Sequence, residues 1–140
     1  MSNPNLKKLK RLTPKKIVRV LYVEDTEVIR DTITRLLQLN GYEVNIAKNG
    51  QEGVTKALQL NPNIILMDLR MPVMDGYNAI EEIRNNPQIR HIPIIVISAW
   101  SSKTERTQAK LAGANEFFVK PPDLNRLIET IEKLVETSVS

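Results

Sequence analysis

From residue 17 onward, short apolar runs rich in β-branched residues alternate with amphipathic stretches. The apolar runs predict five strands, at residues 17–23, 42–48, 63–67, 93–98 and 117–119. Each is followed by apolar residues at helical spacing, which predicts five helices: one after Thr26, one from Asn49 to about Leu60, one after Gly76, one from Ser102 to near Gly113, and one from about Leu124. Five strand–helix repeats with continuously apolar strands indicate an α/β domain, a parallel sheet covered by helices on both faces.

Signals for helix ends support these boundaries. Thr26 can cap the first helix, and Gly41 stands where a left-handed residue commonly ends one. Two pairs of residues three positions apart resemble capping boxes, Asn49 with Glu52 and Ser102 with Glu105.

Length and composition fit one globular domain. The chain has 140 residues, of which 41% are hydrophobic and 26% charged, and it contains no cysteine. No apolar run approaches the roughly 18 residues that a membrane span requires. These values exclude disulfides, thiolate metal sites and a cysteine nucleophile, and we expect a cytoplasmic protein without a membrane span.

The basic charge is concentrated at the N-terminus. Residues 1–16 carry six lysines and arginines and no acid, whereas the rest of the chain has 14 basic and 16 acidic residues. Leucines interleave with these basic residues, so a short amphipathic helix that binds nucleic acid or a membrane surface is one alternative. We favour a flexible, solvated tail, with at most weak binding of nucleic acid.

Polar residues follow four of the five predicted strands. Glu24 and Asp25 follow the first, Asp68 the third, Ser98 ends the fourth, and Lys120 follows the fifth. Loops are polar in any protein, so one such residue alone indicates little. In a flavodoxin-like sheet of order 2-1-3-4-5, however, the carboxyl ends of the first and third strands are neighbours, and the three carboxylates converge.

Three converging carboxylates need positive charge nearby. At 4 to 5 Å each pair repels by about 3 to 4 kcal/mol with an effective dielectric constant near 20. Lys120 neutralises one charge, and a divalent cation balances the other two. Hard oxygen ligands suit Mg²⁺ or Mn²⁺, which predicts a pocket that holds a phosphoryl group on a metal.

Common catalytic motifs do not account for this pocket. The sequence has no phosphate-binding glycine loop and no serine-nucleophile elbow, and its one histidine, His91, precedes the fourth strand. The remaining interpretation is a carboxylate nucleophile that forms an aspartyl phosphate. A metal-dependent phosphatase of the haloacid-dehalogenase type also uses such an Asp, but Arg70 occupies the position of its usual acid/base Asp.

Over residues 17–137 the chain resembles the receiver domains of two-component response regulators. Residues 64–76, with Asp68 at the strand end and Asp75–Gly76 after it, look like the family's phosphoacceptor loop. Three further matches follow in the right order and spacing: Glu24–Asp25, Ser98–Ala99 and Lys120–Pro121. The resemblance implies a flavodoxin-like (βα)5 three-layer sandwich.

The resemblance also implies residue roles. Asp68 would be the phosphoacceptor, and Mg²⁺ would be bound by Asp25, Asp68 and the backbone carbonyl of Arg70, with Glu24 acting mainly through metal-bound water. Ser98 and Lys120 would contact phosphoryl oxygens, and the peptide before Pro121 would be cis. Ser98 and Phe117 would form the conformational switch. Ala99, Trp100 and the Arg70 side chain would edge the pocket.

The function implied is that of a single-domain response regulator, which catalyses only its own phosphorylation and dephosphorylation. Its phosphoryl donor would be a sensor histidine kinase or a histidine phosphotransfer protein. The helix after Ser102 has few apolar residues, so the face formed by residues 102–135 is the expected surface for a downstream partner. Two alternatives remain open: a receiver cut from a larger regulator or hybrid kinase, and a phosphate sink or docking module without a switch.

Overall fold

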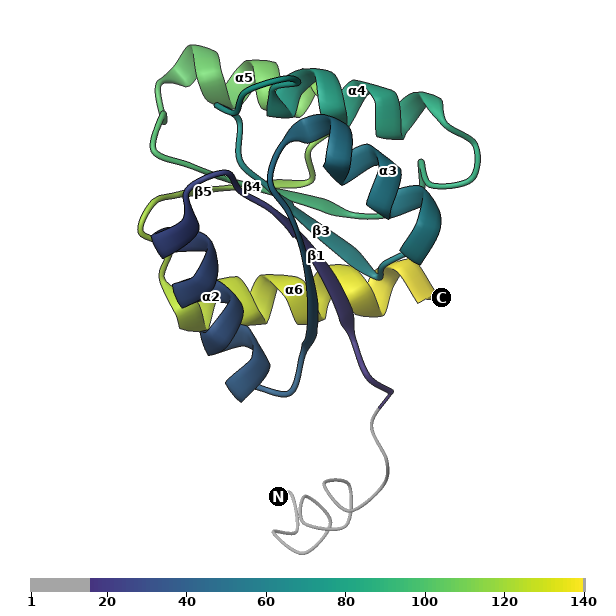
Figure 1. Cartoon of the computed structure of the whole chain (residues 1–140), viewed down its shortest axis with the longest axis vertical. Coiled ribbons are helices and arrows are strands. Elements are labelled where there is room, and N and C mark those ends of the chain that lie inside the picture. Colours follow the sequence, from purple (N-terminus) through teal and green to yellow (C-terminus); the bar gives the residue numbers. More distant parts are fainter. Residues whose placement is uncertain (1–15, 140) are drawn as a thin grey trace, which may run out of the picture.

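The computed structural model describes residues 16–139, which form a three-layer α/β sandwich (Figure 1). The strands are β1 (Arg19–Val23), β2 (Glu43–Ala47), β3 (Ile64–Met67), β4 (Ile94–Ser98) and β5 (Glu116–Val119). The helices are α2 (Glu27–Leu39), α3 (Gly50–Leu60), α4 (Gly76–Asn85), α5 (Lys103–Ala112) and α6 (Leu124–Val139). The predicted basic tail, apart from Lys16, lies outside the described residues.

All strand pairs are parallel, and the order is β2-β1-β3-β4-β5, as the sequence predicts. Four strands are shorter than predicted. The first begins at Arg19 because pairing starts there, opposite Glu43, while Ile17 stays exposed. The fifth is longer at its start, since Glu116 pairs with Ile95.

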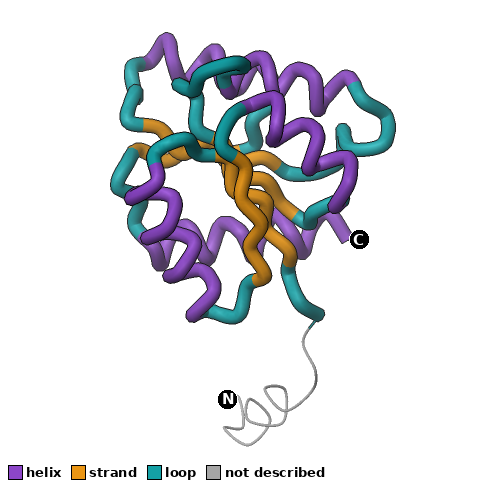
Figure 2. The backbone as a smooth tube through the Cα atoms, viewed as in Figure 1, coloured by secondary structure: helices purple, strands orange, loops and turns teal. Residues whose placement is uncertain are grey.

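The helices divide between the two faces of the sheet (Figure 2). Helices α3, α4 and α5 cover one face, and α2 and α6 cover the other (Figure 1). Alternate strand residues point to opposite faces, so Leu21 and Val23 pack under α3 and α4 while Val20 and Tyr22 pack under α2 and α6. Strands β3 and β4 are buried throughout, which explains their continuous apolar sequences.

The predicted helix ends are confirmed in most cases. The side chains of Asn49 and Ser102 accept hydrogen bonds from the backbone N–H groups of Glu52 (2.8 Å) and Glu105 (3.1 Å). Gly41 has the predicted positive φ, 90°. Thr26 occupies the N-cap position of α2, but its side chain makes no capping hydrogen bond.

Candidate functional site

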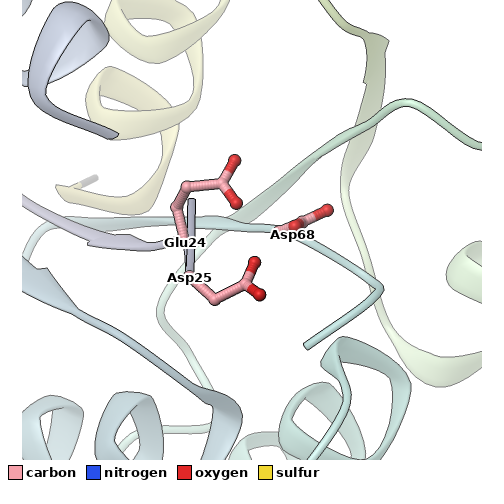
Figure 3. Close-up of side chains that lie close together, drawn as sticks. All are labelled: Glu24, Asp25 and Asp68. Atoms are coloured by element: carbon pink, nitrogen blue, oxygen red, sulfur yellow. The ribbon is translucent and has the colours of Figure 1, made fainter. Parts of the chain in front are cut away.

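The ends of β1 and β3 bring three carboxylates together. The two strands pair with Val23 opposite Met67, and the backbone N–H of Asp68 donates to the carbonyl oxygen of Val23 at 3.0 Å. Glu24 and Asp25 therefore emerge beside Asp68 (Figure 3). One carboxylate oxygen from each residue lies within 4.8 Å of the other two. The convergence that the strand order predicts is present.

Glycine lets the next helix approach this strand end closely. The backbone N–H of Gly76, the first residue of α4, donates to the carbonyl oxygen of Leu69 at 2.9 Å. A Cβ atom at residue 76 would collide with the carbonyl oxygen of Asp68. The loop after Asp68 is thus folded tightly back, and its shape depends on the absence of a side chain at this position.

Lys120 lies between two buried carboxylates. Glu24 is fully buried and Asp68 nearly so, while Asp25 is exposed. The Lys120 ammonium forms ion pairs with Glu24 and with Oδ2 of Asp68, the latter at 3.3 Å. Asp68 Oδ1 accepts a hydrogen bond from the backbone N–H of Leu69 at 2.8 Å. The Lys120–Pro121 peptide is cis, as the resemblance implies.

Electrostatics and donor chemistry fit a divalent cation. Burial, reinforced by the Asp68 carboxylate, raises the pKa of Glu24, and Lys120 opposes that shift only in part. Three carboxylates and one ammonium leave a formal charge of −2 at this edge of the sheet. The ligands available are hard oxygens, the set preferred by Mg²⁺ and Mn²⁺. Glu24, Asp25 and Asp68 could therefore hold such an ion.

Ser98 stands next to Lys120 at the same edge. It ends β4, is fully buried, and its carbonyl oxygen accepts from the Lys120 backbone N–H at 2.9 Å. Its hydroxyl oxygen accepts from the backbone N–H of Trp100 at 3.1 Å. Phe117 is half-buried on β5, with the Arg106 guanidinium 5.2 Å from its ring centroid. The switch role of Ser98 and Phe117 stays a prediction.

Arg70 and Trp100 form the rim. The Arg70 guanidinium carbon lies 4.7 Å from the Trp100 ring centroid, and its Nη2 is 2.9 Å from Oε1 of Glu105. Trp100 is 55% exposed, and Ala99 is exposed beside it. His91 is exposed and precedes β4, at the opposite edge of the sheet from the carboxylates.

Sequence reasoning missed two side chains beneath the carboxylates. Tyr22 is fully buried two residues before Glu24, and burial together with the nearby carboxylates raises the pKa of its hydroxyl. Arg30 is 6% exposed and donates from Nη1 to the carbonyl oxygen of Glu24 at 3.1 Å. A signal was available: Arg30 shares the buried face of α2 with Ile33 and Leu37, where a charged residue requires a partner.

Two more missed residues belong to the rim. The sequence pattern assigned Glu105 only to a capping box, in which its carboxylate would turn back to Ser102. The carboxylate instead accepts hydrogen bonds from Arg70 and from the Tyr77 hydroxyl. Burial, with the neighbouring Glu105 carboxylate, raises the pKa of Tyr77 to about 12. The Tyr77 hydrogen bond in turn holds the pKa of Glu105 below its usual value.

Comparison with known proteins decides the family. The family described as "Response regulator receiver domain" matches residues 20–132. The chain belongs to this family. Receiver domains bind Mg²⁺ at an acidic pocket and interact with histidine kinases and phosphotransfer proteins. The match bears out the predicted receiver family, whereas the alternative of a nucleic-acid-binding tail concerns residues 1–16, which lie outside the match.

Relatives of this receiver domain include short and long proteins. It is 30% identical over 119 residues to Protein PilH of Pseudomonas aeruginosa, with 85% of this chain and 98% of PilH covered. It is 31% identical over 113 residues to the polar-differentiation response regulator DivK of Brucella anthropi, covering 81% of this chain and 92% of DivK. It is 34% identical over 116 residues to the response regulator PleD of Caulobacter vibrioides, covering 83% of this chain and 26% of PleD.

Solved structures share the fold. The chemotaxis protein CheY4 of Vibrio cholerae is 31% identical, with a TM-score of 0.79 and coverage of 85% of this receiver and 99% of that chain. The receiver domain of the sensor histidine kinase PA1611 from P. aeruginosa is 32% identical, with a TM-score of 0.81 and coverage of 86% and 99%. That structure is described with a magnesium ion coordinated in its active site cleft. In residues 16–139 of the present chain, no helix has the length and apolar character to cross a membrane.

Proposed function

We propose that this receiver domain accepts one phosphoryl group on Asp68 in a Mg²⁺-dependent reaction and then signals by binding a partner. The donor is a phosphohistidine on a sensor kinase or phosphotransfer protein. One observation carries the proposal: the Asp68 carboxylate lies between two further carboxylates and an ammonium group, at 3.3 Å from Lys120 Nζ. This arrangement suits a nucleophile whose product is an anionic acyl phosphate.

The chemistry transfers a phosphoryl group between two side chains. An oxygen of the Asp68 carboxylate attacks phosphorus, the P–O bond forms, and the P–N bond to the donor imidazole breaks. The leaving imidazole nitrogen takes up a proton from solvent. Lys120 and the Ser98 hydroxyl hold the phosphoryl oxygens in place. Glu24, Asp25, Asp68 and the carbonyl oxygen of Arg70 would hold a divalent cation, which would neutralise part of the phosphoryl charge.

An apolar groove of about 410 Å³ supports docking of a protein donor next to Asp68. Its walls include Val28, Ile29 and Leu36 of α2 and Pro121 and Pro122 after β5, with Lys120 at the edge facing the site. Val28 is 76% exposed and lines the groove together with Ile29 and Leu36, so the apolar surface offered to a partner is contiguous. We assign the groove to the donor protein, because a partner seated there reaches the side of the site that holds Lys120.

The output surface is assigned to residues 102–135. Ala109 is the only buried residue of α5, so this helix can shift at small energetic cost. We propose a cytoplasmic regulator similar to PilH and DivK, of which this chain covers 98% and 92%, that performs no chemistry beyond its own phosphorylation and dephosphorylation. A receiver within a larger regulator, or a phosphate sink without output, would share the same acceptor chemistry and differ in partner binding.

Intact-mass measurement tests the acceptor chemistry. Incubation with phosphoramidate, a small donor with a P–N bond, and Mg²⁺ should add the mass of one phosphoryl group. Asp68→Asn should abolish the addition. Asp123→Asn is the matched control, since it removes an exposed carboxylate at the same edge of the sheet and leaves a residue that can cap α6. Equal phosphorylation of the Asp68→Asn protein would refute the proposal.

A further inference from the structure

Polar interactions at both ends hold helix α5 to the domain. The helix is flanked by Ser102 and Gly113, and of its residues only Ala109 is buried. Apolar packing alone therefore contributes little to its position. The two sets of polar contacts differ in kind, and only one of them lies at the rim of the phosphoryl site.

Arg84 of α4 attaches the C-terminal end. Its guanidinium donates to the carbonyl oxygens of Gly113 (2.9 Å), Arg90 (2.9 Å) and Ile92 (2.7 Å) and to Oδ1 of Asn115 (3.0 Å). All four acceptors are neutral and belong to the region between α4 and β5. Asp68 lies near the N-terminal end of α4 whereas Arg84 is in its last turn, so a phosphoryl group on Asp68 does not compete for this guanidinium and the attachment should persist.

Glu105 attaches the N-terminal end. Its carboxylate accepts hydrogen bonds from the Tyr77 hydroxyl and from Arg70 Nη2, the latter at 2.9 Å. Arg70 also stacks on Trp100. Arg70 follows Asp68 by two residues, and Trp100 follows Ser98 by two. Arg70, which holds Glu105, thus lies in the loop that follows the phosphoacceptor and stacks on the loop that follows the predicted switch hydroxyl.

A phosphoryl group on Asp68 would compete with Glu105 for the Arg70 guanidinium. The group would carry about 1.5 to 2 negative charges and three acceptor oxygens, in place of the single negative charge of the Asp68 carboxylate. A guanidinium binds phosphate through paired hydrogen bonds, and the Arg70 side chain is 56% exposed, so little packing opposes its rotation. The Glu105 carboxylate offers only one negative charge in return.

We propose that Arg70 is a positioning residue that exchanges partners. It leaves Glu105 for the phosphoryl oxygens on Asp68, so that Glu105 keeps only its Tyr77 hydrogen bond and the N-terminal turn of α5 is held more loosely. The inference rests on the proposed phosphorylation of Asp68. The helix then pivots about its Arg84 attachment, and the N-terminal part of the output surface moves more than the C-terminal part. By linkage, Glu105 in turn opposes occupancy of the phosphoryl position.

Beryllofluoride with Mg²⁺, which mimics a phosphoryl group on Asp68, is the probe for this exchange. Fluorine NMR reports whether the mimic is bound, and amide hydrogen exchange reports the two ends of α5. In wild type, the mimic should increase exchange over residues 103–106 and leave residues 110–113 unchanged. Glu105→Gln should show fast exchange over residues 103–106 without the mimic and bind it about two- to fivefold more tightly, the range expected from an exposed ion pair.

Two further variants complete the test. Arg70→Ala should bind the mimic more weakly than wild type and show no further change over residues 103–106. Glu81→Gln, an exposed position on α4, is the control and should behave as wild type. A wild-type response in Arg70→Ala, or unaltered mimic affinity in Glu105→Gln, would overturn the exchange. No bound fluorine signal in wild type would instead refute the proposed function itself.

Discussion

The Lys120 ammonium lies 3.3 Å from Oδ2 of Asp68 and also pairs with Glu24, although the three residues follow three different strands. Glu24 is fully buried, and the Lys120 side chain is 12% exposed. A buried carboxylate without a partner of opposite charge is strongly destabilising. Lys120 therefore stabilises the metal-free domain in addition to its proposed contact with the phosphoryl group.

Replacing Lys120 should separate these two roles. Lys120→Ala should lower the free energy of unfolding of the metal-free protein by about 3 kcal/mol, because it leaves a buried carboxylate without its partner. Urea unfolding measures this loss. Mg²⁺ binding should be largely retained, since the ammonium is no metal ligand, whereas the conformational response to beryllofluoride should be blunted.

Lys48→Ala provides the control for this substitution. Lys48 follows β2 at the same edge of the sheet, and its side chain is exposed. Its loss should change neither the free energy of unfolding nor the response to the mimic. A Lys120→Ala protein as stable as wild type, with the full response, would show that the ion pairs contribute nothing.

The raised pKa of Glu24 predicts a pH dependence of stability and metal binding. The folded metal-free protein keeps a proton on Glu24 at pH values where the unfolded chain has lost it. This stabilising contribution is complete below the unfolded-state pKa and is lost as pH rises through the folded-state pKa. Mg²⁺ competes with that proton, so the increase in Tm caused by Mg²⁺ should grow as pH rises.

Thermal unfolding from about pH 5 to about pH 8, with and without Mg²⁺, measures both effects. Glu24→Gln should remove the Glu24 contribution to the pH dependence and weaken the metal effect. Glu116→Gln, an exposed position on β5, should retain both. A metal effect that shrinks as pH rises would contradict the expected sign.

Val73 adopts an unfavourable backbone conformation in the loop between β3 and α4. Its φ is +69°, in the left-handed region that β-branched residues avoid, and its side chain is 83% exposed. Val73→Gly should relieve the strain at little loss of packing and raise the free energy of unfolding by about 0.5 to 1 kcal/mol, after the entropy cost of glycine. Urea unfolding measures the gain, and a destabilised variant would show that the Val73 side chain makes a favourable contact.

Sequence patterns predicted those features of the molecule that depend on the order of elements. Apolar runs located β1 and β3, and the 2-1-3-4-5 order then placed Glu24, Asp25 and Asp68 together, since residues that follow adjacent parallel strands must be neighbours. The contacts of long side chains were not predictable in this way. Glu105 fits a capping box by spacing, but its carboxylate binds Arg70, which is 35 residues away.

Thr26 and Tyr22 illustrate the same limit. Thr26 has the residue type and position of an N-cap, yet no side-chain hydrogen bond forms; the Glu24 carboxylate instead lies 3.4 Å from the Thr26 backbone N–H. In the sequence Tyr22 looks like an ordinary apolar strand residue. That its hydroxyl lies near the carboxylates is apparent only once the structure locates them. Local patterns fix which residues share a face, whereas rotamers and tertiary partners decide which polar atoms meet.

Chemical mapping of the phosphorylated residue tests the central claim most directly. An aspartyl phosphate is reduced by borohydride to homoserine, so protein treated with phosphoramidate and Mg²⁺, then reduced and digested, carries a permanent mark at its phosphoacceptor. Peptide mass spectrometry should find homoserine at position 68 and at no other Asp, and only when both donor and Mg²⁺ were present. Homoserine at position 25 with an unmodified Asp68, or no homoserine at all, would contradict the assignment of Asp68 as the phosphoacceptor.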